Sequence, residues 1–221
     1  NVDKGGVISL PEEISFEAGT FVEPLGCALR GQRRIGLQPG DSVLVLGSGL
    51  AGLLNIKLAR ALGAGRIAAT DVQPFRLQAA LDSGAQAAID ARSDSVVERA
   101  LAANDGHGFE HVIVCTAASG TFPQALRGVI SGGNVLLYAF SRPSTEIPLD
   151  LHEYFRKAIT LRSTYGASPL DLKQAVNMLR FGTVEVEDLI THRLSLAETG
   201  LGFSLVAGGS ESLKVIIEPG R

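Results

Sequence analysis

Three glycines with the spacing G-x-G-x-x-G follow a short apolar run and open a stretch with helical periodicity: Gly47, Gly49 and Gly52. A glycine-rich turn between a strand and a helix can hold the pyrophosphate of a dinucleotide, because the first N–H groups of the helix point at the phosphates. Gly47 would permit the tight turn, Gly49 the close approach of the pyrophosphate, and Gly52 the close packing of helix and strand. We expect the N–H groups of Leu50 and Ala51 to be the phosphate donors.

A second feature supports this interpretation. Asp71 ends the next β-rich run, about twenty residues after the glycines. A carboxylate in that place accepts hydrogen bonds from the adenosine ribose and repels a 2′-phosphate, so the sequence predicts a site that prefers NAD over NADP. Arg76 is expected near the same ribose and weakens that preference slightly. A plain turn without a ligand is the alternative, and the register of strand, turn, helix and acid argues against it.

The elements that would position these residues alternate from Gln38 onward. Predicted strands are short apolar runs, at residues 42–46, 66–70, 85–89, 111–115, 134–140, 159–163 and 213–217. Predicted helices have apolar residues at helical spacing, at residues 50–62, 74–81, 94–103, 120–129 and 169–181. Strands that are apolar throughout are buried on both faces, so the sequence predicts an α/β fold with a doubly wound parallel sheet of the Rossmann type.

Composition narrows the class of protein. The chain has 221 residues, of which 45% are hydrophobic, and a net charge of −3, so we expect a folded core and no nucleic-acid partner. No apolar run approaches the roughly 20 residues of a membrane span. Two cysteines, Cys27 and Cys115, do not make a disulfide framework. We therefore expect a cytoplasmic protein without a membrane partner.

The chain resembles the medium-chain dehydrogenase/reductase superfamily, and within it the zinc-dependent alcohol dehydrogenases of the sorbitol and threonine dehydrogenase type. The matching stretches are FVEPLGCALRG, QPGDSVLVLGSGLAGLLNIKLARALGAGRIAATD, GGNVLLYAF, DLITHRLSL and LKVIIEP. The resemblance to the polyol-type branch depends mainly on Glu23-Pro24. The resemblance implies that residues 1–37 end the first part of a GroES-like catalytic domain. Residues 38–183 would form the dinucleotide-binding domain, and residues 184–221 the return to the catalytic domain.

The same resemblance implies that most of the catalytic domain lies outside this chain. The chain opens Asn1-Val2-Asp3 without an initiator methionine, and we expect it to be a piece of a longer protein. The family's catalytic zinc is held by a Cys and a His-Glu pair, and its structural zinc by four cysteines; neither set has a counterpart here. Glu23 alone matches a position at the catalytic zinc, so it is the catalytic and the metal candidate. Apolar residues of segments 1–37 and 197–217 are expected to be exposed.

Further cofactor contacts are carried over from the family position by position. Lys214 matches a basic position near the pyrophosphate, and Thr116 a position under the cofactor at a strand end. Tyr138, Ser163 and Tyr165 match positions whose backbone groups hold the nicotinamide carboxamide. Each of the last four also has an ordinary structural reading, either as a strand-end hydroxyl or as the edge of the core.

Support for a functional role is weaker for the histidines and for Cys27. His107 and His111 have a spacing that can place two zinc ligands on one helix face, but the glycines around His107 and the strand pattern at His111 argue against it. Cys27 is expected to lie close to Glu23, with a packing role favoured over a catalytic one. His192 matches a family feature without a catalytic role.

These residues and the resemblance together predict an NAD-dependent oxidoreductase. In the whole protein, zinc would act as a Lewis acid on the hydroxyl of a secondary alcohol or polyol, and hydride would pass to NAD. The expected partners are that small molecule and further copies of the chain, in a dimer or tetramer paired through the sheet edge. Two alternatives stay open: a stand-alone dinucleotide-binding module without catalysis, and a zinc-free quinone-reductase-type member.

Overall fold

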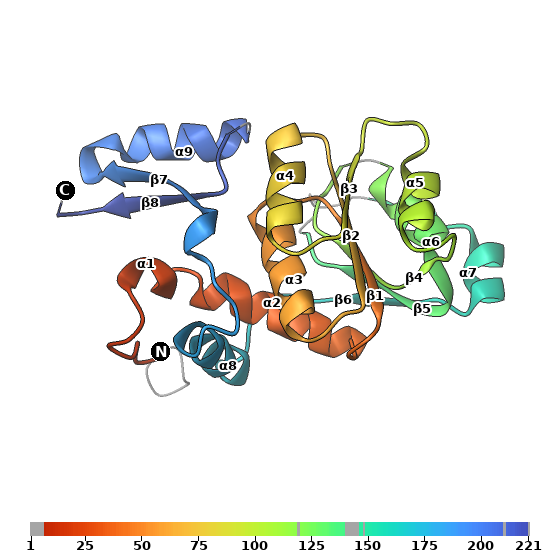
Figure 1. Ribbon diagram of the computed structural model, residues 1–221, viewed down its shortest axis with the longest axis horizontal. Helices are drawn as coiled ribbons and strands as arrows, with labels where there is room; N and C mark the ends of the chain where they lie inside the picture. Colours follow the sequence, from red (N-terminus) through yellow and green to blue (C-terminus); the bar gives the residue numbers. More distant parts are fainter. Residues whose placement is uncertain (1–6, 119, 140–145, 148, 210, 221) are drawn as a thin grey trace.

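A computed structural model of the chain describes residues 7–118, 120–139, 146–147, 149–209 and 211–220. Within these residues, parallel strands form a main sheet in the order β3-β2-β1-β4-β5-β6 (Figure 1). The strands are β1 (Ser42–Leu46), β2 (Arg66–Asp71), β3 (Ala87–Asp90), β4 (Phe109–Val114), β5 (Val129–Leu137) and β6 (Thr160–Ser163). The chain builds outward from β1 to β3 and then returns to build β4, β5 and β6 on the other side. The predicted doubly wound parallel sheet is confirmed.

Helices cover both faces of this sheet (Figure 1). One face carries α2 (Val22–Ile35), α3 (Leu50–Ala61) and α4 (Pro74–Asp82); the other carries α5 (Val96–Ala103) and α6 (Thr121–Gly128), with α7 (Leu151–Lys157) beside β5. Alternate side chains of β1 enter two cores. Val43 and Val45 pack with α2 and α3, whereas Leu44 and Leu46 pack with α5 and α6. Burial on both sides explains why this strand is apolar throughout.

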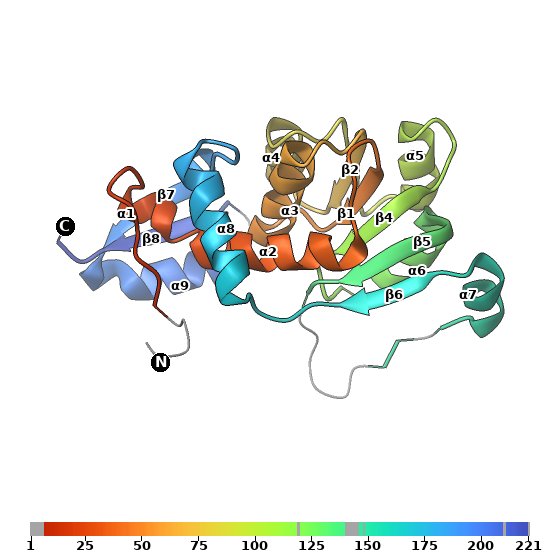
Figure 2. The same cartoon turned by 90° about the horizontal axis from the view of Figure 1, so that it is seen from below.

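A second, smaller unit lies beyond one end of α2 (Figures 1 and 2). β7 (Ile190–Ser195) and β8 (Lys214–Glu218) pair in parallel and are joined through α9 (Thr199–Gly208). The short α1 (Phe16–Gly19), α8 (Pro169–Arg180) and two 3₁₀ turns, Glu187–Leu189 and Leu196–Glu198, complete the described chain. Part of the expected apolar surface is confirmed here, since large side chains of α1 and α9 are exposed: Phe16, Leu201, Phe203 and Val206.

α2 packs against the main sheet although it comes from segment 1–37, which the sequence analysis placed in another domain. Phe21, its N-cap residue, is fully buried in the core that contains Val43. The helix also approaches β5 closely, because a Cβ on Gly31 would already lie 3.0 Å from Leu136 Cδ2. The boundary after residue 37 therefore stays a proposal, and α2 makes its helix contacts with α3 and α8.

Several bounds differ from the predicted ones. β3 begins at Ala87 rather than at 85, and β5 begins at Val129 rather than at 134. The predicted end of that strand, Phe140, lies outside the described residues. α1, α2, α7, β7 and α9 were not predicted. No helix in the described part of the chain combines the length and the hydropathy that crossing a membrane demands.

Candidate dinucleotide-binding site

Parallel strands bring the predicted cofactor residues to one edge of the main sheet. At their carboxyl ends, β1 leads into the glycine turn and β2 ends at Asp71, while β6 ends at Ser163. Thr116 and Tyr138 follow the ends of β4 and β5. β1 and β4 are neighbours from which the chain builds in opposite directions, and open α/β sheets bind their ligands in the crevice at such a point.

The glycine turn is tight at Gly47 and Gly52, the two positions where the sequence predicts it. Gly47 has a φ of +96°, and its N–H donates to the carbonyl of Thr70 at 2.9 Å. A Cβ on Gly52 would lie 1.9 Å from the carbonyl oxygen of Gly47, so no side chain fits there. Gly49 has a φ of −67°, and a Cβ there would meet nothing closer than Arg76 Nη1 at 3.9 Å. The space in front of Gly49 is therefore open to a ligand.

α3 starts directly after this turn. The first N–H groups of a helix have no partner within the helix, and Gly49, the N-cap residue, has no side chain to accept from them. Leu50 and Ala51 consequently present N–H groups at the positive end of the helix dipole. Tight backbone, open space and free donors fit the phosphates of a dinucleotide.

Asp71 is held in place by two backbone groups. Its Oδ2 accepts from Ser48 N at 2.8 Å and its Oδ1 from Gln73 N at 2.9 Å. A carboxylate has about four acceptor positions, so positions remain for ribose hydroxyls. Ser48 is fully buried and was not singled out from the sequence; its position between two glycines is the one signal for it. Ser48 fixes the carboxylate beside the glycine turn.

Arg76 reaches across this region from the first turn of α4. Its Nη1 lies 4.0 Å from Asp71 Oδ2. Its Nη2 would lie 3.1 Å from a Cβ on Gly209, which follows α9. Its Nε is buried without a hydrogen-bond partner among the described residues. The guanidinium thus stands beside the expected ribose position, where a 2′-phosphate would also approach.

The remaining carried-over residues differ in exposure. Thr116 lies against the turn, since a Cβ on Gly47 would be 3.0 Å from Thr116 Cβ. Ser163 is exposed, and Tyr165 is 85% exposed. The backbone N–H of Tyr138 donates to the carbonyl of Val114 at 3.1 Å. Only the backbone carbonyl of Tyr138 is therefore left to bind the nicotinamide carboxamide.

The side chain of Tyr138 turns toward the start of α2. Its hydroxyl lies 3.5 Å from the carbonyl oxygen of Pro24. Burial raises the pKa of Tyr138, and the negative charge of Glu23 acts in the same direction. The edge of the sheet that carries the glycine turn therefore adjoins the helix start that carries Glu23.

Glu23 is exposed in the first turn of α2, and its Oε1 accepts a hydrogen bond from Cys27 Sγ at 3.1 Å. Lys214 lies close by: its Nζ donates to the carbonyl of Thr20 at 3.3 Å and stands 5.1 Å from the centre of the Phe21 ring. Burial lowers the pKa of Lys214, and the charge of Glu23 opposes that shift. The expected place of Lys214 near the pyrophosphate stays a prediction.

A zinc ion in proteins takes about four ligands from Cys, His, Asp and Glu. Glu23 and Cys27 are two such groups, and the described residues contain no group of three or more that could hold a metal. They do not by themselves fit a zinc ion, so Glu23 stays a candidate for one ligand.

The contacts of His111 and His192 are those of structural residues. His111 is buried on β4, with Nε2 2.8 Å from Asp41 Oδ2. His192 on β7 has Nδ1 3.0 Å from Thr191 Oγ1. His107 lies in the loop before β4 rather than on a helix face shared with His111, as the glycines around it indicate.

Alkylation of Cys27 is expected to be slow and to depend on Glu23. Burial first, and then the hydrogen bond to Glu23, raise the pKa of Cys27 to about 12. Its reactive thiolate at pH 8 is thus on the order of one molecule in ten thousand. Glu23→Gln removes the negative charge and lowers the pKa, so the rate with iodoacetamide at pH 8 should rise about tenfold. Mass spectrometry reports each thiol separately, and Cys115, whose pKa burial also raises, is the internal control. Equal rates for Cys27 in both proteins would show that Glu23 does not control it.

Comparison with known proteins places this geometry in context. The family model described as "Zinc-binding dehydrogenase" matches residues 51–180. Probable D-xylulose reductase A of Aspergillus clavatus is 33% identical over 212 residues, which cover 94% of this chain and 58% of that protein. Human sorbitol dehydrogenase is 30% identical over 214 residues, which cover 95% of this chain and 58% of that protein.

Solved structures share the fold. A zinc-binding dehydrogenase of Sinorhizobium meliloti 1021, solved with NADP bound, superposes with a TM-score of 0.88 at 26% identity. The match covers 96% of this chain and 62% of that one. The chain therefore spans less than two thirds of the length of the relatives it matches.

Proposed function

Because the chain belongs to the zinc-binding dehydrogenase family, we propose that it is the NAD-binding part of an oxidoreductase acting on a secondary alcohol or polyol. One observation carries the proposal. The glycine turn, the start of α3 and Asp71 meet at the switch point of the sheet, with open space in front of Gly49. The names of the similar proteins, a sorbitol dehydrogenase and a xylulose reductase, support the substrate class.

Each residue of the site has a proposed task. The N–H groups of Leu50 and Ala51 bind the pyrophosphate, and Asp71 accepts from the adenosine ribose hydroxyls. Thr116 lies under the cofactor at the end of β4. NAD supplies the hydride chemistry, and the protein binds and orients it. One similar structure holds NADP, so the proposed preference for NAD rests on Asp71, with Arg76 beside it.

The remaining carried-over residues are proposed to complete the site. Lys214 would approach the pyrophosphate, and the backbone of Tyr138, Ser163 and Tyr165 the carboxamide. Glu23 is proposed as one contact of a zinc ion in the whole protein.

We further propose the division into segments 1–37, 38–183 and 184–221, a cytoplasmic location and a dimer or tetramer. β6 is the last strand on one side of the described sheet, so its outer edge can pair with a second copy. Light scattering at micromolar concentration tests this assembly, and a monomer would contradict it.

An activity assay on the whole protein tests the proposed reaction. We expect NAD-dependent oxidation of sorbitol and NADH-dependent reduction of D-xylulose, both lost after zinc chelation and restored by added zinc. Glu23→Ala should lower kcat/KM by about a hundredfold, because a metal contact is lost. Asp82→Asn, on the exposed side of α4, is the matched control and should be fully active. Quinone reduction with NADPH that resists chelation would instead identify the zinc-free type.

A further inference from the structure

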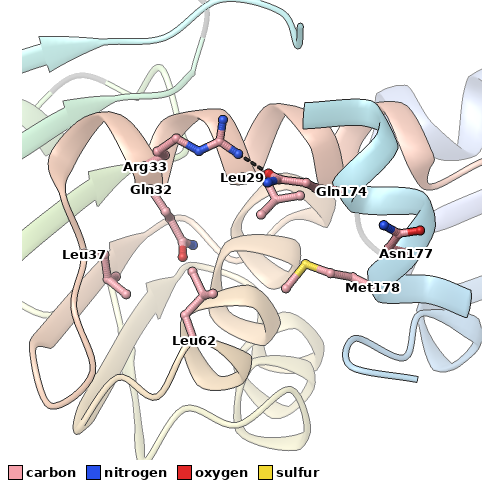
Figure 3. A pocket seen from close by; sticks show the side chains of 8 residues that line it. All are labelled: Leu29, Gln32, Arg33, Leu37, Leu62, Gln174, Asn177 and Met178. Carbon is pink, nitrogen blue, oxygen red and sulfur yellow. Dashed lines mark hydrogen bonds between the residues drawn. The ribbon is translucent and has the colours of Figure 1, made fainter. Parts of the chain in front are cut away.

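A pocket lies away from the cofactor edge, between α2, α3 and α8 (Figure 3). Its volume is about 420 Å³, within the range of small-molecule sites. Leu37 and Leu62 line it shortly before the chain enters β1 and β2. It therefore lies toward the amino ends of the strands, whereas the glycine turn lies at their carboxyl ends.

The walls of this pocket are largely apolar. Leu29 from α2, Leu37, Leu62 and Met178 from α8 point their side chains toward one another around it (Figure 3). Such walls favour a ligand with an apolar body, because burying apolar surface is the main source of affinity in concave sites.

Gln32 brings an unpaired acceptor to this apolar space. Its side chain is 1% exposed, and its Nε2 donates to the backbone carbonyl of Asn55 at 2.7 Å and to Asn55 Oδ1 at 3.1 Å. These bonds fix the orientation of the amide, whose Oε1 has no hydrogen-bond partner among the described residues. In Figure 3 the amide points between Leu37 and Leu62.

The charged residue at the rim is already engaged. Arg33 Nη1 lies 2.8 Å from Asp171 Oδ1, and its Nη2 donates to Gln174 Oε1 (Figure 3). These two contacts hold the guanidinium at the rim, and its carboxylate partner is 2% exposed and also lies 3.6 Å from Arg30. Asn177, the other polar residue of the lining, is exposed to solvent, so the buried polar requirement of the pocket is one hydrogen-bond donor for Gln32 Oε1.

We propose that this pocket binds a small neutral molecule with an apolar body and one hydroxyl group, of the phenol type, whose hydroxyl donates to Gln32 Oε1. The site is separate from the cofactor site and does not depend on the proposed dehydrogenase activity. Its ligand is recognised by shape, by the apolar walls and by the single donor.

The single methionine of the sequence provides a direct probe, because Met178 lines the pocket. With the methionine methyl group labelled with ¹³C, titration with p-cresol should shift its NMR signal saturably. The methyl ether, 4-methylanisole, has a similar shape but no donor, and it should bind about tenfold more weakly. Absence of a saturable shift, or equal binding of the ether, would overturn the proposal.

Two substitutions locate the binding. Leu37→Trp should fill the pocket while the Gln32 side chain itself is unchanged in identity, and p-cresol should then no longer shift the signal. Leu170→Trp, at a site of α8 that is 56% exposed and outside the pocket, should bind as the unmodified chain does. Saturating NAD should leave the p-cresol affinity unchanged. Binding that survives Leu37→Trp, or that NAD abolishes, would place the phenol elsewhere and overturn the proposal.

Discussion

Gly52→Ala is expected to destabilise the chain and abolish dinucleotide binding. The new Cβ would lie 1.9 Å from the oxygen and 2.9 Å from the carbon of the Gly47 carbonyl, and these are backbone atoms that cannot rotate away. Either α3 or the turn must move, at a cost of about 3 kcal/mol. For a chain of this size that corresponds to a fall in Tm of about 6 to 12 °C. Calorimetric melting and titration with NAD measure the two effects.

Gly49→Ala is the matched control in the same turn. Its φ of −67° suits alanine, and its Cβ would meet nothing closer than 3.9 Å, so Tm should stay nearly constant. The added methyl would stand in the space proposed for the pyrophosphate, and NAD affinity should fall about tenfold or more. A stable Gly52→Ala protein that binds NAD normally would contradict the account of the turn.

Asp71→Asn is expected to shift the cofactor preference toward NADP. The carboxylate accepts two backbone N–H groups and repels a 2′-phosphate, and an amide loses the charge and one of the acceptors. Arg76, 4.0 Å away, then faces a 2′-phosphate without its neutralising carboxylate. We expect the NAD/NADP affinity ratio to fall about tenfold or more. The lost hydrogen bond should also lower the free energy of unfolding by about 2 kcal/mol.

A second substitution separates the two causes. Adding Arg76→Ala to Asp71→Asn should remove the gain for NADP while leaving NAD binding as weak as in Asp71→Asn, because the cation that pairs the 2′-phosphate is gone. Isothermal titration of each variant with both dinucleotides measures the coupling. An affinity ratio that Asp71→Asn leaves unchanged would show that Asp71 does not select the ribose.

The main sheet was predictable because its strands are apolar on both faces. Such a run, as at 42–46, is recognisable without any partner. α2 was not predicted because segment 1–37 was assigned to another domain, although Leu25, Leu29 and Ile35 recur at helical spacing. The partners of its buried face, α3, α8 and β5, follow only from the tertiary fold. Gly31 is an example: it allows the helix to approach Leu136, and no local pattern indicates that contact. α7 is short and has no buried residue, so the sequence gives it no clear periodicity.

The residues of the candidate site likewise include some that the sequence predicts and some that it does not. The turn and Asp71 carry a spacing that physical chemistry explains, and it could be interpreted directly from the sequence. Ser48 acts on Asp71 through its backbone N–H, which any residue except proline possesses, so its identity carries little information. Gln32 is similar, because its buried contact with Asn55 joins two helices whose packing is set by the tertiary fold.

Titration calorimetry of the unmodified chain with NAD and, separately, with NADP tests the central claim most directly. We predict saturable binding of NAD with an affinity clearly above that of NADP. Binding of neither dinucleotide would contradict the claim that the turn, the start of α3 and Asp71 form a working cofactor site. Tighter binding of NADP would keep the site and contradict the proposed role of Asp71.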